Sequence, residues 1–125
     1  NNPNDQRIEF RPPDATCNVY LAVAAQLMAG LDGILHEIDP TEAGFGPFDS
    51  NIFTWSEDER KKIKGLPTSL GQALKALERD HEFLLAGDVM DAEFIQDWIE
   101  YKMRHEHLEV RDRPHPYEMA LYFDV

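Results

Sequence analysis

Two shortages restrict what this 125-residue chain can do: it has one cysteine, and half as many basic as acidic side chains. Cys17 alone forms neither an internal disulfide nor a thiolate zinc cage, so a reducing compartment such as the cytoplasm is expected. Twelve Lys and Arg against twenty-four Asp and Glu leave a net charge of −12. Because this charge repels nucleic-acid phosphates and anionic lipids at long range, we expect no nucleic acid and no membrane as a primary partner.

A long hydrophobic run is also absent. The longest apolar stretch, from Val19 to Leu31, has about thirteen residues, whereas a membrane-spanning helix needs about 20. We predict that this stretch is a helix buried in the core. With 42% hydrophobic and 29% charged residues, the composition is typical of one globular domain. The chain starts at Asn1 in a polar segment without an initiating Met, and we expect it to be a piece of a longer protein.

The remaining pattern is mainly helical, with one strand near the start. Polar and apolar residues alternate over 6–11, which predicts a strand that Pro12 and Pro13 end. Four capping residues and one proline predict the starts of five helices: Asn18, Ser56, Ser69, Asp91 and Pro116. Glu59 and Gln72, each three residues after a serine, predict capping boxes. Residues 39–55 combine prolines, glycines and scattered aromatics and predict a long ordered loop.

The predicted strand carries charged residues of alternating sign. Arg7, Glu9 and Arg11 are spaced by two residues and would project from one face, roughly 6–7 Å apart. A glutamate oxygen is a hard ligand for Mg²⁺ or Mn²⁺, and arginines fork onto anionic oxygens, so the row suits a divalent cation held against an anionic ligand. The alternative is a solvated sheet face with weak cross-strand ion pairs. The spacing alone leaves both interpretations open.

Four stretches of the sequence form a more specific pattern. They are Arg7-Ile8-Glu9-Phe10-Arg11-Pro12-Pro13-Asp14, Asn18-Val19-Tyr20-Leu21, Leu27-Met28-Ala29-Gly30-Leu31-Asp32-Gly33-Ile34 and Pro114-His115-Pro116-Tyr117-Glu118-Met119-Ala120-Leu121-Tyr122. In this order and with these spacings, the chain resembles the C-terminal part of bacterial type I glutamine synthetase. The resemblance runs along the whole chain and covers about the last quarter of such an enzyme.

This resemblance implies a fold: an α+β fragment that is mainly α. Residues 1–13 would form one strand of a catalytic barrel and carry site residues. Residues 14–113 would form a helical region that includes the loop 39–55, and residues 114–125 a C-terminal helical tail used in assembly. Since one strand cannot form a sheet alone, the other barrel strands are expected outside this chain.

The resemblance also implies a function, that of glutamine synthetase (glutamate–ammonia ligase). Such enzymes use ATP to phosphorylate L-glutamate, ammonia displaces phosphate from γ-glutamyl phosphate, and two Mg²⁺ or Mn²⁺ sites and a homo-oligomer of two stacked hexamers are implied. Glu9 matches a metal ligand, Arg11 matches the arginine that binds L-glutamate, and Arg7 and Asn4 match nucleotide contacts, although Asn4 replaces a usual lysine. Because one glutamate cannot hold two cations, the chain alone is expected to be inactive.

Two classes of function stay open. The chain is either the C-terminal region of such a ligase or a non-catalytic helical interaction module, and a reading frame upstream of Asn1 or a natural start codon near it would decide. Two minor sites are weaker. His105 and His107 are two apart on a predicted helix, about 200° around its axis, and cannot share a metal. For Cys17 we expect a small buried side chain.

Overall fold

The computed structural model describes residues 3–5 and 9–124, and this part of the chain is mainly helical, as predicted. The α-helices are α1 (Val19–Leu35), α2 (Glu57–Arg60), α3 (Leu70–Arg79), α4 (Ala92–Lys102), α5 (Leu108–Arg111) and α6 (Pro116–Tyr122). Shorter helical segments are η1 (Pro3–Asp5), η2 (Ile52–Thr54), η3 (Glu82–Asp88) and the π-helical η4 (Met103–His107).

The strand predicted over 6–11 does not form at Glu9, Phe10 and Arg11, which have no regular secondary structure. Residues 6–8 of that prediction lie outside the described residues. The physical reason is pairing: a strand is stabilised by backbone hydrogen bonds to a neighbouring strand, and the described ranges 3–5 and 9–124 contain no strand to provide them.

Helix starts follow the predicted caps. The side-chain oxygen of Asn18 accepts from the backbone N–H groups of Tyr20 and Leu21, and Asp91 accepts from the N–H group of Phe94. At α2 the predicted capping box is complete, because Ser56 and Glu59 each bond the other's backbone N–H.

At α3 the predicted capping box forms only in half. Ser69 caps the N–H group of Gln72, whereas the Gln72 side chain accepts from Thr68 instead of Ser69. Apart from that exchange, the local signals were sufficient to place the helix starts.

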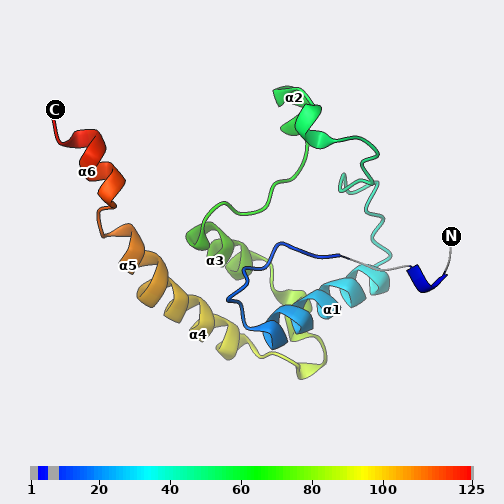
Figure 1. Ribbon diagram of the computed structural model, residues 1–125. Coiled ribbons are helices and arrows are strands. Elements are labelled where there is room, and N and C mark those ends of the chain that lie inside the picture. The colour runs from blue at the N-terminus through cyan, green and yellow to red at the C-terminus, as the bar shows by residue number, and fades with distance from the viewer. Residues whose placement is uncertain (1–2, 6–8, 125) are drawn as a thin grey trace.

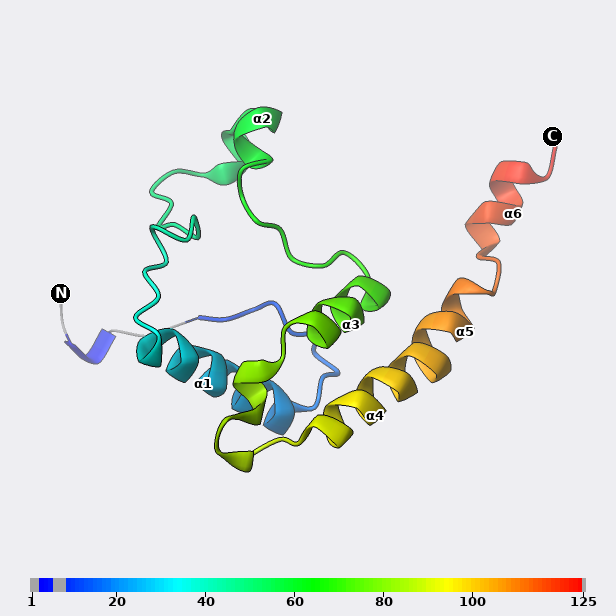
Figure 2. The same cartoon turned by 180° about the vertical axis from the view of Figure 1, so that it is seen from behind.

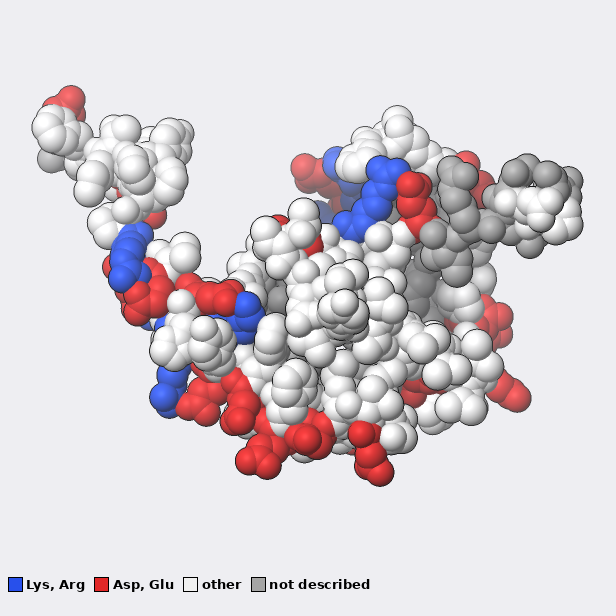
Figure 3. Space-filling view, turned by 60° about the horizontal axis from the view of Figure 1, so that its bottom comes forward, with Lys and Arg blue, Asp and Glu red and all other residues white. Residues whose placement is uncertain are grey.

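A small apolar core joins four elements. Among the described residues, its five buried side chains, on α1, α3, η3 and α4, are Met28, Leu74, Leu84, Ile95 and Ile99. From this helical cluster, α4, η4, α5 and α6 lead away as one long arm, and α2 with its flanking loop lies apart from the cluster (Figures 1 and 2). In the space-filling view, acidic side chains gather along one edge of the cluster, while several of the basic ones follow the arm (Figure 3).

The prediction that α1 is a buried core helix is wrong for the described structure. Met28 is its one buried residue, and Tyr20, Ile34 and Leu35 are 84%, 74% and 75% exposed. The helix is apolar on nearly all sides, but within the described residues it packs mainly against η3, which covers one side. Along the described ranges, every helix is too short or too polar to cross a membrane.

The π-helical segment η4 widens the arm where it passes α3. The N–H group of Leu108 donates to the carbonyl oxygen of Met103, five residues earlier, so this turn takes in one more residue than an α-turn. In an α-helix, side chains four residues apart drift by about 40° around the axis, and the wider turn cancels part of that drift. At the end of this segment His107 lies over Gly71, where a Cβ atom would meet its imidazole ring at 2.6 Å from Nε2.

A double-mutant cycle on Gly71→Ala and His107→Ala tests this close contact. Alanine favours a helix over glycine by up to about 1 kcal/mol, whereas pushing the half-buried imidazole aside costs about 1 kcal/mol or more. Gly71→Ala should therefore be neutral or destabilising when His107 is present and stabilising in a His107→Ala background. Denaturant unfolding of the complete protein measures both, and equal effects of Gly71→Ala in the two backgrounds would show that the contact carries no energy.

Candidate functional site

Two residues of the predicted row of charges, Glu9 and Arg11, form an ion pair in the structure. The guanidinium nitrogen Nη2 of Arg11 donates to Oε1 of Glu9 at 2.7 Å, and the two side chains are 80% and 60% exposed. The pair joins residues two apart in the sequence and needs no contact from another element. Exposed pairs of this kind contribute about 0–1 kcal/mol, so other charged groups can displace either partner.

Of the other two predicted site residues, Asn4 and Arg7, the structure describes Asn4. Asn4 is exposed on the short helix η1, five residues before Glu9. Arg7 lies outside the described residues. The structure therefore brings together Glu9 and Arg11 of the four predicted residues and leaves the predicted nucleotide contacts untested.

Glu9 suits a divalent cation as one ligand among several. Its carboxylate is open to solvent and offers the hard oxygen atoms that Mg²⁺ or Mn²⁺ requires of a ligand. Among the described residues, no group of three or more His, Cys, Asp or Glu side chains could hold a metal ion. The remaining ligands of a metal bound at Glu9 would have to come from outside this described part of the chain.

A turn connects the site segment, Glu9–Arg11, to α1. After Pro12 and Pro13, Oδ1 of Asp14 accepts from the hydroxyl and the backbone N–H of Thr16, at 2.7 and 2.8 Å. These bonds, the hydroxyl first, hold the pKa of Asp14 below its ordinary value. Asp14 therefore stays ionised at neutral pH and accepts both bonds of the turn that joins the site segment to α1.

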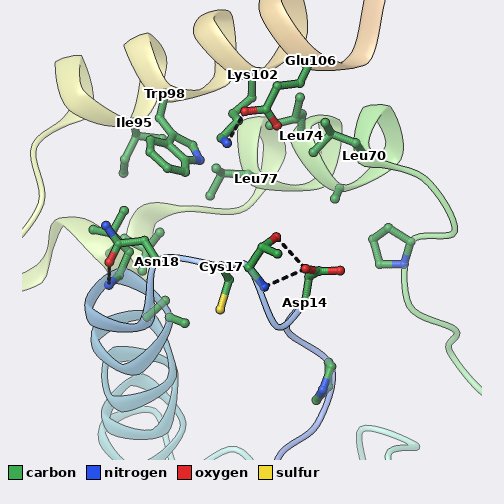
Figure 4. Close-up of a pocket in the computed structure, with 18 of the residues that line it drawn as sticks. Asp14, Cys17, Asn18, Leu70, Leu74, Leu77, Ile95, Trp98, Lys102 and Glu106 are labelled. Carbon is green, nitrogen blue, oxygen red and sulfur yellow. Dashed lines mark hydrogen bonds and ion pairs between the residues drawn. The ribbon is translucent and has the colours of Figure 1, made fainter. Parts of the chain in front are cut away.

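A cavity of about 890 Å³ lies directly beside this turn, between the chain 12–18, α1, α3 and α4. Its lining is mostly apolar, with Leu74, Leu77 and Ile95 among its walls (Figure 4). At one rim Lys102 pairs with Glu106 and lies 4.9 Å from the centre of the Trp98 ring. No pattern in the sequence predicts this cavity, because segments far apart in the chain form it.

Cys17 lines the cavity and is exposed, so the expectation of a buried thiol is wrong. It directly precedes Asn18, the cap of α1, and lies in the part of the cavity lining that is open to solvent. The two histidines of the arm make separate contacts. The ring centroids of His105 and Tyr101 are 4.8 Å apart with the rings tilted, and His107 contacts Gly71. Neither contact gathers other metal ligands around it.

Comparisons with known proteins place the chain in a family. The model of the family described as "Glutamine synthetase, catalytic domain" matches residues 1–122. Proteins named glutamine synthetase from Aquifex aeolicus, Nostoc sp. and Streptomyces coelicolor are 56%, 50% and 47% identical to this chain, each over 124 residues. Each alignment covers 99% of this chain and 25%, 25% and 26% of the relative. The chain therefore spans about a quarter of the length of these relatives.

The match along nearly the whole chain shows that this chain belongs to the glutamine synthetase catalytic-domain family. More particularly, it is homologous to the C-terminal part of that domain in bacterial glutamine synthetases, which confirms the resemblance found in the sequence.

Proposed function

We propose that this chain supplies one side of the active site of a cytoplasmic glutamine synthetase, which ligates ammonia to L-glutamate through γ-glutamyl phosphate with ATP as phosphoryl donor. The observation that carries the proposal is the solvent-exposed pair of Glu9 and Arg11 within a chain matched to the catalytic domain. In this proposal Glu9 is a ligand of Mg²⁺ or Mn²⁺, and Arg11 binds L-glutamate. Arg7 and Asn4 contact the nucleotide.

The charges on the two substrates explain why these residue types are needed. Phosphorylation of L-glutamate brings the anionic oxygens of ATP against a carboxylate, and the two repel each other. Arg11 can fork two N–H groups onto a carboxylate or phosphoryl oxygen and so orient it. A divalent cation, when bound, neutralises the phosphoryl oxygens, and Glu9 offers it one hard oxygen ligand.

Assembly is the second part of the proposal. We place the chain in a homo-oligomer of two stacked hexamers, with the tail 114–125 in contact with the opposite ring. The support is the exposed apolar surface of the tail, whose aromatic residues Tyr117, Tyr122 and Phe123 are 65%, 68% and 85% exposed.

The 125-residue chain by itself should show no γ-glutamyl transfer and only weak, non-stoichiometric Mn²⁺ binding. The reason is the ligand count, since one carboxylate cannot hold two cations. Transfer assays and Mn²⁺ titration of the isolated chain, run beside the complete enzyme as the positive control, measure both. Turnover by the isolated chain, or one tightly bound Mn²⁺ per chain, would contradict the proposed division of the site.

A non-catalytic helical interaction module remains the second candidate. The apolar face that α1 exposes favours it, because such a face is typical of surfaces that dock onto a partner. The genomic reading frame separates the two candidates. A frame that continues upstream through the rest of the catalytic domain supports the ligase, and a natural start codon near Asn1 supports the module.

A further inference from the structure

The arginine proposed to bind substrate is paired with the carboxylate proposed to bind metal. Arg11 Nη2 and Glu9 Oε1 are 2.7 Å apart, so a cationic group already pairs with one of the two oxygens of the carboxylate. We propose that Arg11 is an internal competitor of the divalent cation for Glu9, so that metal binding releases Arg11 toward the anionic substrate. This inference rests on the proposed function of the two residues and adds an order to their use.

The pair is built locally, so no other part of the described chain is needed to form it. Glu9 and Arg11 are two residues apart, and their contact forms without help from any other helix. Pro12 and Pro13 follow at once; each has a restricted φ and no N–H group. The Asp14–Thr16 turn then fixes the chain. The segment that carries the pair is therefore held at one end and open to solvent at its side chains.

The strength of the pair suits a competitor that a metal can displace. Both side chains are more than half exposed, and an ion pair of this kind shifts a binding equilibrium by about two- to fivefold at most. A divalent cation with several ligands overcomes a competitor of that size. Linkage is reciprocal: if pairing with Arg11 weakens metal binding by a given factor, metal binding weakens the pairing by the same factor and leaves Arg11 available for an anionic ligand.

Mn²⁺ binding to the metal-stripped complete protein tests the competition directly. Arg11→Gln should lower the Mn²⁺ dissociation constant of the site at Glu9 by about two- to fivefold, as measured from free Mn²⁺ by electron paramagnetic resonance. Arg7→Gln is the matched variant, since it removes the same charge at the same sequence distance from Glu9, and it should have a smaller effect. Glu9→Gln should remove this Mn²⁺ site altogether.

L-Glutamate binding to the metal-free complete protein is the second measurement. Glu9→Gln frees Arg11 and should tighten L-glutamate binding by about two- to fivefold in calorimetric titration. Asp14→Asn removes an equal charge three residues beyond Arg11 while keeping an acceptor for Thr16, and it should leave the affinity closer to that of the wild type. If the Arg11→Gln protein fails to assemble, this L-glutamate measurement tests the proposal by itself.

The outcomes separate the inference from the function on which it rests. An unchanged or weaker Mn²⁺ affinity in Arg11→Gln overturns the competition, and so does an equal gain in Arg7→Gln, which would indicate a general charge effect. Unchanged L-glutamate affinity in Glu9→Gln, or an equal gain in Asp14→Asn, overturns it as well. Full Mn²⁺ stoichiometry in Glu9→Gln would instead overturn the proposed metal role of Glu9.

Discussion

Replacing Glu9 with alanine in the complete enzyme is expected to lower the rate of glutamine formation by about two orders of magnitude or more. Loss of a residue that merely orients a metal ligand typically costs 10- to 100-fold, so loss of a ligand should cost at least as much. The fold should remain intact, because the Glu9 side chain is 60% exposed and its contact with Arg11 is a surface ion pair. Initial rates at saturating Mg²⁺, together with thermal unfolding, measure both effects.

Asp58→Ala is the matched control for that variant. Asp58 is also an exposed carboxylate in an ion pair, with Nζ of Lys61 at 3.1 Å, but it lies on α2, apart from the site segment. We expect near-wild-type rates and stability after its removal. If Glu9→Ala turned over as fast as this control at saturating Mg²⁺, Glu9 would not be a metal ligand.

Deleting residues 117–125 from the complete enzyme should convert double rings into single rings. The helix α6 lies at the far end of the arm, away from the helical cluster (Figure 2). This helix and the residue after it expose large apolar side chains. They are Tyr117, Met119, Leu121, Tyr122 and Phe123, each more than half exposed. Because exposing apolar surface to water is unfavourable, we expect these side chains to be covered in the assembled protein. Sedimentation velocity would detect the change from double to single rings.

Replacing a polar residue of the same helix provides the control for the deletion. Glu118→Ala changes α6 without removing apolar surface and should leave the double ring intact. The competing arrangement is a tail that folds back on its own subunit. An unchanged double ring after the deletion would favour that arrangement and contradict docking onto the opposite ring.

Local features of this structure could be predicted from the sequence, and features that depend on distant parts of the protein could not. The caps at Asn18, Ser56 and Asp91 were predictable because each bonds a backbone group two or three residues away. The burial of α1 was not, since apolar residues on all sides of a helix say that it will be covered but not by what. A strand over 6–11 likewise depends on partners that the described residues do not include.

In the candidate site, too, the local feature could be predicted from the sequence and the features that involve distant residues could not. The proximity of Glu9 and Arg11 follows from their spacing, because alternate residues of an extended chain share a face. Their roles came from the family resemblance, since charge spacing fits a solvated surface equally well. The cavity beside Cys17 gave no sequence signal, because it is built where residues 12–18 meet helices that follow dozens of positions later.

The extra residue taken in by η4 sets the rotational phase of everything beyond it. If η4 closed as an ordinary α-helix with all of its residues kept, α5 and α6 would rotate by about 100° relative to α4. The composition of the tail would be unchanged, yet its aromatic residues would point in another direction. The π-turn thus aims the tail, and the geometry by which one subunit could meet another is encoded at a position remote from the surface that makes the contact.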